Sequence, residues 1–267
     1  MQELFVADAD NYSDRSSFGP LSDEFRGGHY GVMETSGYLW REQRRFSLHA
    51  LRDIGLSKKE MQERILLEAQ ALMDIFEAEG ETGPVTPLKF LDQTVARVIN
   101  VVLFGFRFDE TNCNKFRKIR DLLDAQTKAF TDPIALMFLD KPWMRDRIPY
   151  TKRIYDLFIE TRDSMFEFFQ SNIDEHRKNI DYDSEDNSDF CDAYLKEIKK
   201  NEDDPHTSFH DRQFVALCLD LWVAGMETTV STMAWGVVLL LHHPKVFPEP
   251  SKFDPKRFLD KNGNVTQ

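Results

Sequence analysis

The chain has 267 residues, of which 34 are Lys or Arg and 46 are Asp or Glu, so its formal net charge is −12. This acidic balance excludes a general basic surface for nucleic acid and argues against a polybasic membrane anchor. An apolar content of 41%, with 22 Phe residues, supplies a packed core and excludes a wholly disordered chain. The length suits one large domain or two modest ones.

The cysteines and the amino-terminal residues indicate the cellular compartment in which the chain folds. Cys113, Cys191 and Cys218 lie far apart, which gives neither a disulfide framework nor a zinc motif and fits a reducing compartment. The opening MQELFVADAD has no basic start and no apolar run, so no signal peptide is predicted. Residues 228–244 carry no charge, but they are fewer than the ~18–20 apolar residues of a spanning helix. The sequence predicts a soluble or peripheral chain.

Helical periodicity dominates the first half of the chain. The run Ser57-Lys58-Lys59-Glu60 has the pattern of a capping box and predicts a helix that ends at Gly80. Thr86-Pro87 predicts the start of another helix, which ends at Gly105.

Two long amphipathic helices are predicted next, over residues 113–130 and 150–177. The apolar connection between them, residues 130–139, either lines a substrate entrance or touches a membrane, or packs as ordinary core. The acidic stretch 179–189 predicts a solvated loop.

The longest predicted helix begins near Ser208, which can cap it, and ends near His243 ahead of a proline. At 1.5 Å per residue it is roughly 50 Å long, so it crosses the whole domain. Its apolar residues outnumber its charged ones on every face, which predicts that Leu217, Leu221 and Val238 are all buried. Extended segments are scarce, so the predicted fold class is mainly α.

The middle of this helix carries the run Ala224-Gly225-Met226-Glu227-Thr228-Thr229. An interior Gly costs about 1 kcal/mol against Ala, and Thr is a poor helix former, so helix propensity does not explain these residues. Ala224 and Gly225 would let a flat group approach the backbone, with the Thr228 hydroxyl beside it. Glu227, among apolar neighbours, needs a partner or a raised pKa. The alternative is a Gly/Thr kink with a water-facing Glu at a helix crossing.

Two further patterns lie upstream and downstream. Trp40 and Arg44 are four residues apart and therefore share a helix face, from which a guanidinium can bind a carboxylate in bidentate fashion. Taken alone, such a pair is usually plain helix surface. Near the end of the chain, residues 247–260 read FPEPSKFDPKRFLD.

In this order the three patterns resemble the cytochrome P-450 family of haem-thiolate monooxygenases, and in particular its microsomal, drug-metabolising branch. The run 224–229 is similar to the family's central-helix motif, Trp40 to Arg44 to its W-x-x-x-R helix, and 247–260 to its F-x-x-P-x-x-F-x-P-x-R-F segment. Residues 26–35 and 45–56 also resemble that branch. The resemblance covers the chain from residue 8 onward. It implies a partial cytochrome P-450 fold, the helical half, as a single domain over residues 1–267.

The resemblance also implies roles. Haem is the implied cofactor, with Trp40 and Arg44 on a propionate, Ala224 and Gly225 as the dioxygen groove, and Glu227 with Thr228 as proton relay. Arg15 is similar in position to a further propionate-binding arginine. The implied reaction is hydroxylation of small apolar compounds, with electrons from a flavin-containing reductase, at the cytoplasmic face of the endoplasmic reticulum membrane.

Three family segments have no counterpart in residues 1–267: the amino-terminal anchor with the first strands, the E-x-x-R helix, and the cysteine loop that ligates the iron. The E-x-x-R helix would fall between Val246 and Phe247, where two matching segments abut, so an internal gap is predicted there. None of the three cysteines lies in a glycine-rich loop. Each is therefore predicted to be structural or surface, and no residue is assigned as metal ligand.

These departures keep two hypotheses open. The first is the monooxygenase, with this chain by itself inactive for want of the cysteine ligand. The second is a non-catalytic fragment, or a splice or gene-model product, that does not bind haem stably; a folded helical binding module is a lesser variant. Because the family partners of Phe253, Arg257 and Phe258 are missing, residues 247–267 are predicted to pack poorly and to make the purified chain aggregation-prone.

Overall fold

The computed structural model describes residues 9–12, 14–15, 20–56, 58–109, 111–133 and 141–243. Within these ranges no strand occurs, and the mainly α prediction is confirmed. The elements, in chain order, are η2 (Ala9–Tyr12), α1 (Pro20–Arg26), α2 (Gly37–Asp53), α3 (Lys59–Gly80), α4 (Pro87–Phe104), α5 (Cys113–Thr131), α7 (Pro142–Arg145), α8 (Pro149–Arg177), α9 (Phe190–Lys200) and α10 (Asp211–His242).

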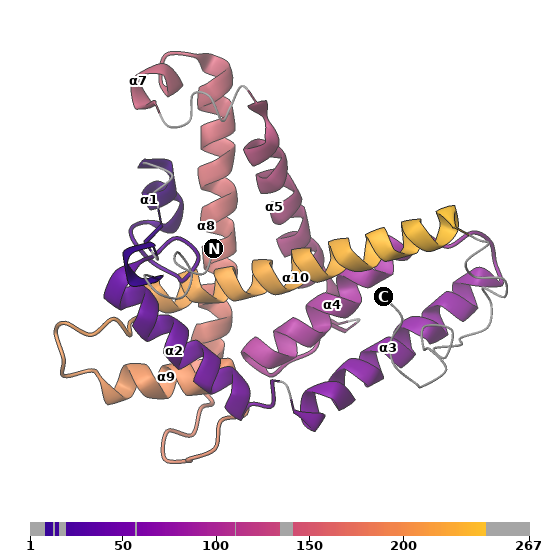
Figure 1. The fold of residues 1–267 in the computed structure, drawn as a ribbon, viewed down its shortest axis with the longest axis horizontal. Helices are drawn as coiled ribbons and strands as arrows, with labels where there is room; N and C mark the ends of the chain where they lie inside the picture. Colours follow the sequence, from indigo (N-terminus) through magenta and orange to yellow (C-terminus); the bar gives the residue numbers. More distant parts are fainter. Residues whose placement is uncertain are drawn as a thin grey trace.

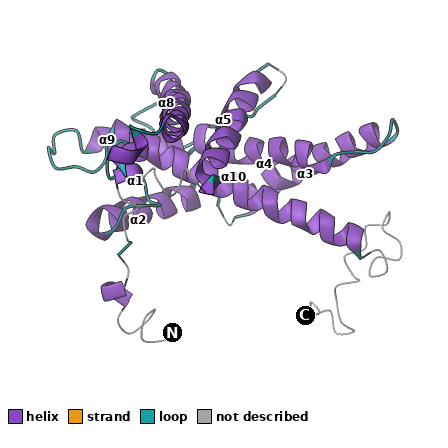
Figure 2. Cartoon of the chain, turned by 90° about the horizontal axis from the view of Figure 1, so that it is seen from above, coloured by secondary structure: helices purple, strands orange, loops and turns teal. Residues whose placement is uncertain are grey.

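Helix α10 runs across the molecule and organises the other helices (Figure 1). It packs against α4 on one side and against α8 on another, while α5 pairs with α8 and α3 pairs with α4. Seen from above, α5 and α8 project from one side of α10 (Figure 2). The predicted central helix is therefore present, and residues 247–267 and 134–140 lie outside the described part of the chain.

Helix α4 begins and ends where the sequence predicts. Pro87 follows the N-cap Thr86, and Gly105 closes the helix at φ +69°, a left-handed conformation that favours glycine. A Cβ atom at Gly105 would lie only 2.5 Å from Asp189 Oδ2, so the position also requires the absence of a side chain. Two constraints thus select the same residue.

The predicted capping box of α3 starts at Ser57, which lies outside the described residues, and the predicted cap of α10 is wrong. At the start of α3 the N-cap is Lys58, and it makes no side-chain capping bond. At the start of α10 the N-cap is His210, whose ring accepts the Gln213 N–H at 3.3 Å.

The predicted cap Ser208 is instead used by tertiary structure. Its hydroxyl donates to Glu42 and accepts from Gln43 Nε2 at 2.7 Å, both in α2. The buried Gln43 also accepts the Tyr194 hydroxyl of α9 at 2.8 Å. Because Ser208 Oγ faces α2, it cannot also cap the helix that follows it.

The amino-terminal half of α10 is the centre of the core. Leu217 and Trp222 are fully buried, and Phe214 stacks on Tyr194 with ring centroids 4.2 Å apart. The prediction that the helix is buried on all sides is wrong for its second half, where Val238 is 39% exposed and Leu241 73%. Beyond Val230 no residue of α10 is fully buried, so apolar side chains remain in contact with solvent.

By length and hydropathy, α10 could cross a membrane, which differs from the expectation drawn from residues 228–244 alone. However, 56% of its most apolar window is buried inside the protein, as in a core helix. The helix therefore serves here as the central packing element.

The segment that follows α1 is fixed to α10 through Asp220, a residue that the sequence analysis missed. The Asp220 carboxylate lies 2.5 Å from Arg26 Nη1 and accepts the backbone N–H groups of Val32 and Met33 at 2.7 and 3.0 Å. Gln213, two turns earlier on the same face of α10, bonds both the N–H and the carbonyl of Gly31. A Cβ at Gly31, where φ is +83°, would lie 2.2 Å from Asp220 Oδ2.

Burial raises the pKa of Asp220, and the neighbouring Arg26 guanidinium is the main influence that lowers it again. Both side chains are almost completely removed from solvent. A buried carboxylate without its cation is costly, so the fold of the segment 26–35 depends on this pair.

We expect Arg26→Met to lower the free energy of unfolding by about 3–5 kcal/mol, because the substitution leaves the Asp220 carboxylate buried and unpaired. Chemical denaturation followed by circular dichroism measures the change. The matched control is Lys59→Met, which removes the cation of the solvent-exposed Lys59–Glu63 pair and should change stability little. Equal effects of the two substitutions would show that the buried pair has no special role.

Candidate functional site

Trp40, near the start of α2, lies between two guanidinium groups. The Arg15 Cζ atom is 5.2 Å from the Trp40 ring centroid and the Arg44 Cζ atom is 5.5 Å away, both within cation–π range. Arg15 is held at this point by Nη1, which donates to the Thr35 carbonyl at 2.6 Å, and by its backbone N–H, which donates to Ser36 Oγ at 2.8 Å. The structure thus brings together the two arginines that the sequence analysis assigned to propionates.

This pair of cations has the properties of an anion site. Among the described residues no carboxylate lies within ion-pair distance of Arg15 or Arg44, and both arginines are exposed. Each guanidinium carries N–H donors in a planar fork that matches a carboxylate. Two like charges on one indole repel, so binding an anion would stabilise the arrangement.

On α10, the 224–229 run presents a row of hydroxyls bonded back to the helix. Thr228 Oγ1 donates to the Ala224 carbonyl at 2.7 Å, and Thr229 Oγ1 donates to the Gly225 carbonyl at 2.8 Å. Such bonds to the i−4 carbonyl weaken and bend a helix slightly. Ala224 and Thr228 are both exposed and share one face, so a small side chain and a hydroxyl lie side by side on an open surface.

Gly225 faces in a different direction from Ala224. A Cβ atom added there would come 3.0 Å from Ile99 Cδ1 of α4. Gly225 therefore lies in close contact with α4, in agreement with the helix-crossing alternative considered for this motif. The groove role of Ala224 and Gly225 stays a prediction.

Glu227 has the charged partner that its apolar neighbours require. Its carboxylate pairs with Arg120 Nη1 of α5. The same guanidinium contacts Asp92 Oδ2 of α4 at 3.1 Å and Asp124 Oδ1 at 3.2 Å. Burial raises the pKa of Asp92, against the lowering influence of Arg120. One arginine thus joins three helices, and Glu227 is ion-paired although its side chain stays 37% exposed to solvent.

The Glu227 and Thr228 side chains therefore leave α10 in different directions. Consecutive helical residues are about 100° apart around the axis. Glu227 is directed toward α5, whereas Thr228 lies on the exposed face. Their joint role as a proton relay stays a prediction.

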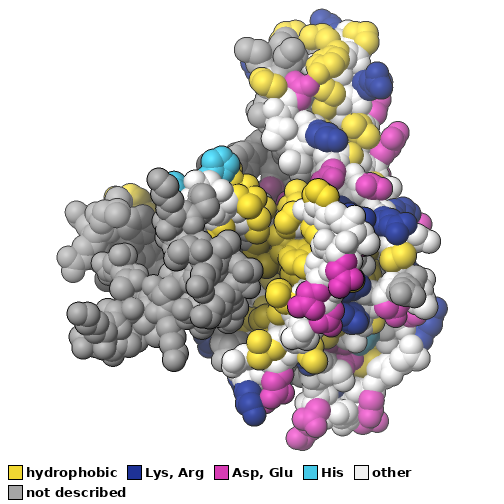
Figure 3. All heavy atoms as spheres, turned by 90° about the vertical axis from the view of Figure 1, so that its right-hand side faces the viewer, with side chains coloured by type: hydrophobic (Ala, Val, Ile, Leu, Met, Phe, Trp, Pro, Cys, Tyr) yellow, Lys and Arg dark blue, Asp and Glu magenta, His cyan; other side chains and the backbone are white. Residues whose placement is uncertain are grey.

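An apolar pocket of about 460 Å³ lies between α3, α4 and α10. Gly225, Thr229 and Met233 form its α10 side, and Leu72 and Val98 are among the residues opposite. Figure 3, which views the molecule from the side at which α10 ends, shows hydrophobic side chains gathered around a hollow. The apolar exposure of the second half of α10 continues this surface.

The positions of the three cysteines fit the predicted structural or surface roles. Cys191 and Cys218 are completely buried, and burial raises the pKa of both thiols. Cys113 is the first residue of α5 and is half-buried. A buried thiol with a raised pKa is a poor thiolate donor, which fits a structural role for Cys191 and Cys218; that neither ligates an iron stays a prediction.

These features define a helical domain with a long central helix, a cluster of two arginines on one tryptophan and an open face of small residues on that helix. Sequence comparison gives the class. The family model for cytochrome P-450 matches residues 1–246 and 239–267, which together span the chain.

Individual relatives agree. Human (Homo sapiens) cytochrome P-450 2J2 is 34% identical over 216 residues, covering 81% of this chain and 42% of the relative. Rabbit (Oryctolagus cuniculus) cytochrome P-450 2G1 is 32% identical over 247 residues, covering 92% of this chain and 48% of the relative. The chain belongs to the cytochrome P-450 family, and it spans about half the length of the curated relatives it matches.

We expect Arg120→Gln to lower the free energy of unfolding by about 1–3 kcal/mol, because the Asp92 and Glu227 carboxylates then lose their shared cation in a partly buried setting. Urea unfolding measures the loss. Asp124→Asn removes the most exposed of the three carboxylates and serves as the control, with little expected change. A stability loss for Asp124→Asn as large as that for Arg120→Gln would contradict this account of the cluster.

Proposed function

We propose that this chain forms the helical part of a haem-dependent monooxygenase that hydroxylates small apolar organic compounds. The family membership supports the reaction class, and the Arg15–Trp40–Arg44 arrangement is the observation that carries the proposal for this chain. Two exposed guanidinium groups next to one indole suit the two carboxylates of a haem edge.

The described residues fit haem in two respects. The guanidinium pair provides the donors for propionates, and the face of Ala224 and Thr228 provides a close approach on the central helix. When bound, haem supplies the activation of dioxygen that no amino-acid side chain can supply. The protein's part is to hold the cofactor, to exclude water and to position protons.

Thr228 and Glu227 have separate tasks in this proposal. The Thr228 hydroxyl, which donates to the Ala224 carbonyl, retains oxygen lone pairs that can hold a water molecule on the open face of α10. Glu227, half-buried and bonded to Arg120, reaches that face only by leaving the guanidinium. Arg120 would then control when the carboxylate exchanges protons there.

The setting of the whole protein follows from the same proposal. The electron donor is a flavin-containing reductase, and the protein lies at the cytoplasmic face of the endoplasmic reticulum membrane. The predicted membrane or substrate contact of the 130–139 connection falls almost entirely outside the described residues and stays a prediction. The gap between Val246 and Phe247 also stays a prediction. The family model matches the chain in two separate segments, which overlap at residues 239–246, and this supports the gap.

Haem titration of residues 1–267 tests the cofactor site. We expect weak binding, seen as a change in haem absorbance, with no thiolate-type spectrum after reduction and addition of carbon monoxide, because Cys191 and Cys218 are buried thiols. Arg44→Ala should weaken haem binding about tenfold, the loss of one charge-assisted contact.

Arg52→Ala, an exposed arginine later in α2, is the control and should bind haem like the unaltered chain. The proposal for the anion site fails if Arg44→Ala and Arg52→Ala bind haem equally well. A stable thiolate spectrum from residues 1–267 would contradict the assignment of all three cysteines.

The full-length protein tests the reaction. Sequencing the transcript across the Val246–Phe247 codons establishes whether an E-x-x-R segment intervenes. In the complete enzyme, we expect Thr228→Ala to lower the fraction of consumed electrons that appears in hydroxylated product, while haem content stays constant, because Thr228 acts after cofactor binding. The amount of hydroxylated product and the number of electrons taken from the electron donor are measured in the same reaction. Thr228→Ser, which keeps a hydroxyl, should restore the coupling of electron use to product formation. Unchanged coupling in Thr228→Ala would show that Thr228 has no part in the mechanism.

A further inference from the structure

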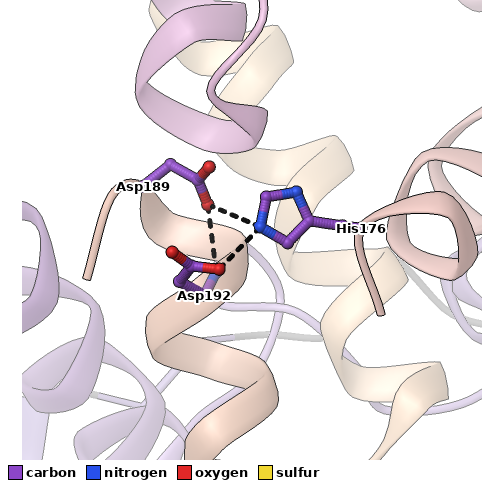
Figure 4. A group of neighbouring side chains, drawn as sticks. All are labelled: His176, Asp189 and Asp192. Atoms are coloured by element: carbon purple, nitrogen blue, oxygen red, sulfur yellow. Dashed lines mark hydrogen bonds and ion pairs between the residues drawn. The ribbon is translucent and has the colours of Figure 1, made fainter. Parts of the chain in front are cut away.

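A cluster of three metal-ligating side chains lies at the junction of α8 and α9, remote in sequence from the motifs of the proposed haem site. His176 belongs to the last turn of α8, Asp189 is the N-cap of α9, and Asp192 is in its first turn (Figure 4). His176 Nε2 lies 2.7 Å from Asp192 Oδ1 and 3.4 Å from Asp189 Oδ1. One ligand atom from each residue lies within 4.8 Å of the other two.

The carboxylates are oriented by the backbone around them. Asp192 Oδ2 accepts the Ser188 N–H at 3.0 Å, and Asp189 Oδ1 accepts the Asp192 N–H at 3.0 Å. Asp189 is 1% exposed and Asp192 9%. Ligands held by such outer bonds on helix ends are pre-organised, which is what a metal site requires.

The electrostatic environment favours a cation beyond the two carboxylates. The carboxyl-terminal end of α8 carries His176, and the carboxyl-terminal end of α4 lies against Asp189, because a Cβ at Gly105 would be 2.5 Å from Asp189 Oδ2. Helix carboxyl ends carry partial negative charge.

The nearby cations Lys196 and Arg177 form hydrogen bonds with groups other than the three side chains of the cluster. Lys196 donates to the Ser184 and Asp186 carbonyls at 2.9 and 2.6 Å. Arg177 pairs with Asp211 at 2.5 Å. The amino-terminal end of α9, where Asp189 and Asp192 lie, has the opposite dipole, and the Asp192 N–H there is bonded to Asp189.

A pocket of about 290 Å³ opens beside the cluster and provides access for an ion. His176 and Asp192 line it, together with Asp181, Ser184 and Asp186 of the acidic loop and the cation Lys196 of α9. Additional oxygen donors and water can therefore complete a coordination sphere. The acidic loop, predicted from sequence only as a solvated segment, forms the wall of this pocket.

We propose that His176, Asp189 and Asp192 bind a divalent transition-metal ion of the zinc class, which joins the end of α8 to the start of α9. One imidazole nitrogen and two carboxylate oxygens, with water in the fourth position, are suited to Zn²⁺ or Co²⁺. The ion replaces the direct His176–Asp192 hydrogen bond with bonds to a shared centre. Its role is structural, and it does not depend on haem or on the proposed reaction.

Titration of the chelator-treated chain with Zn²⁺, followed by calorimetry, tests this site. We expect saturable binding of one ion per chain, and His176→Ala and Asp192→Asn should each weaken it at least tenfold. The matched control is His49→Ala, which removes an exposed imidazole 3.5 Å from Asp53 on α2 and should leave binding unchanged. Circular dichroism reports whether each variant is folded.

A second variant locates the ion even if His176→Ala misfolds. His176→Cys should bind Co²⁺ and show the thiolate-to-cobalt charge-transfer absorption that the unaltered chain lacks, because the new sulfur is then a ligand. The site is refuted if the unaltered chain binds no stoichiometric Zn²⁺, if His49→Ala and His176→Ala titrate alike, or if folded His176→Cys shows no charge-transfer band. The cluster is then an ion pair with a helix cap.

Discussion

The structure depends on one buried carboxylate. Asp220 lies in the middle of the core on α10, where an isolated charge would be strongly unfavourable. Arg26 and the backbone of residues 31–33 satisfy it, and in doing so they fix the polypeptide between α1 and α2 against the central helix. The position of α2, and with it Trp40 and Arg44, follows from where that segment ends. A polar contact inside the core thus determines where the exposed Trp40–Arg44 pair lies.

The central helix has three distinct surfaces along its length. Its first half is buried and carries Asp220. Its middle presents Gly225 to α4, Glu227 to α5 and Thr228 to an open face. Its last turns are apolar and exposed. A single helix therefore supplies the packing centre, the charged link between helices and the candidate cofactor face, because residues one and two positions apart point in different directions.

The sequence predicted what depends on periodicity and local chemistry. Helix α4, the extent of α10 and the need of Glu227 for a partner all follow from spacing, glycine and burial. The partner itself, Arg120, lies 107 residues away and carries no local signal. Ser208 failed as a cap for the same reason, since its hydroxyl is used by Glu42 and Gln43 in α2. The second half of α10 was misjudged because its composition indicates burial, whereas exposure depends on which other elements are present.

The threonine hydroxyls of α10 make the helix axis itself adjustable. Thr228, Thr229 and Thr232 each donate to the carbonyl four residues earlier, so three neighbouring carbonyls each accept two donors. When a threonine hydroxyl rotates to bind a water molecule or a ligand, the carbonyl four residues earlier still accepts its backbone N–H hydrogen bond. The local curvature of the helix can then change without a break in the ladder. Binding of a ligand at the open face would thereby change the bend of α10 and shift the position of its apolar carboxyl-terminal end.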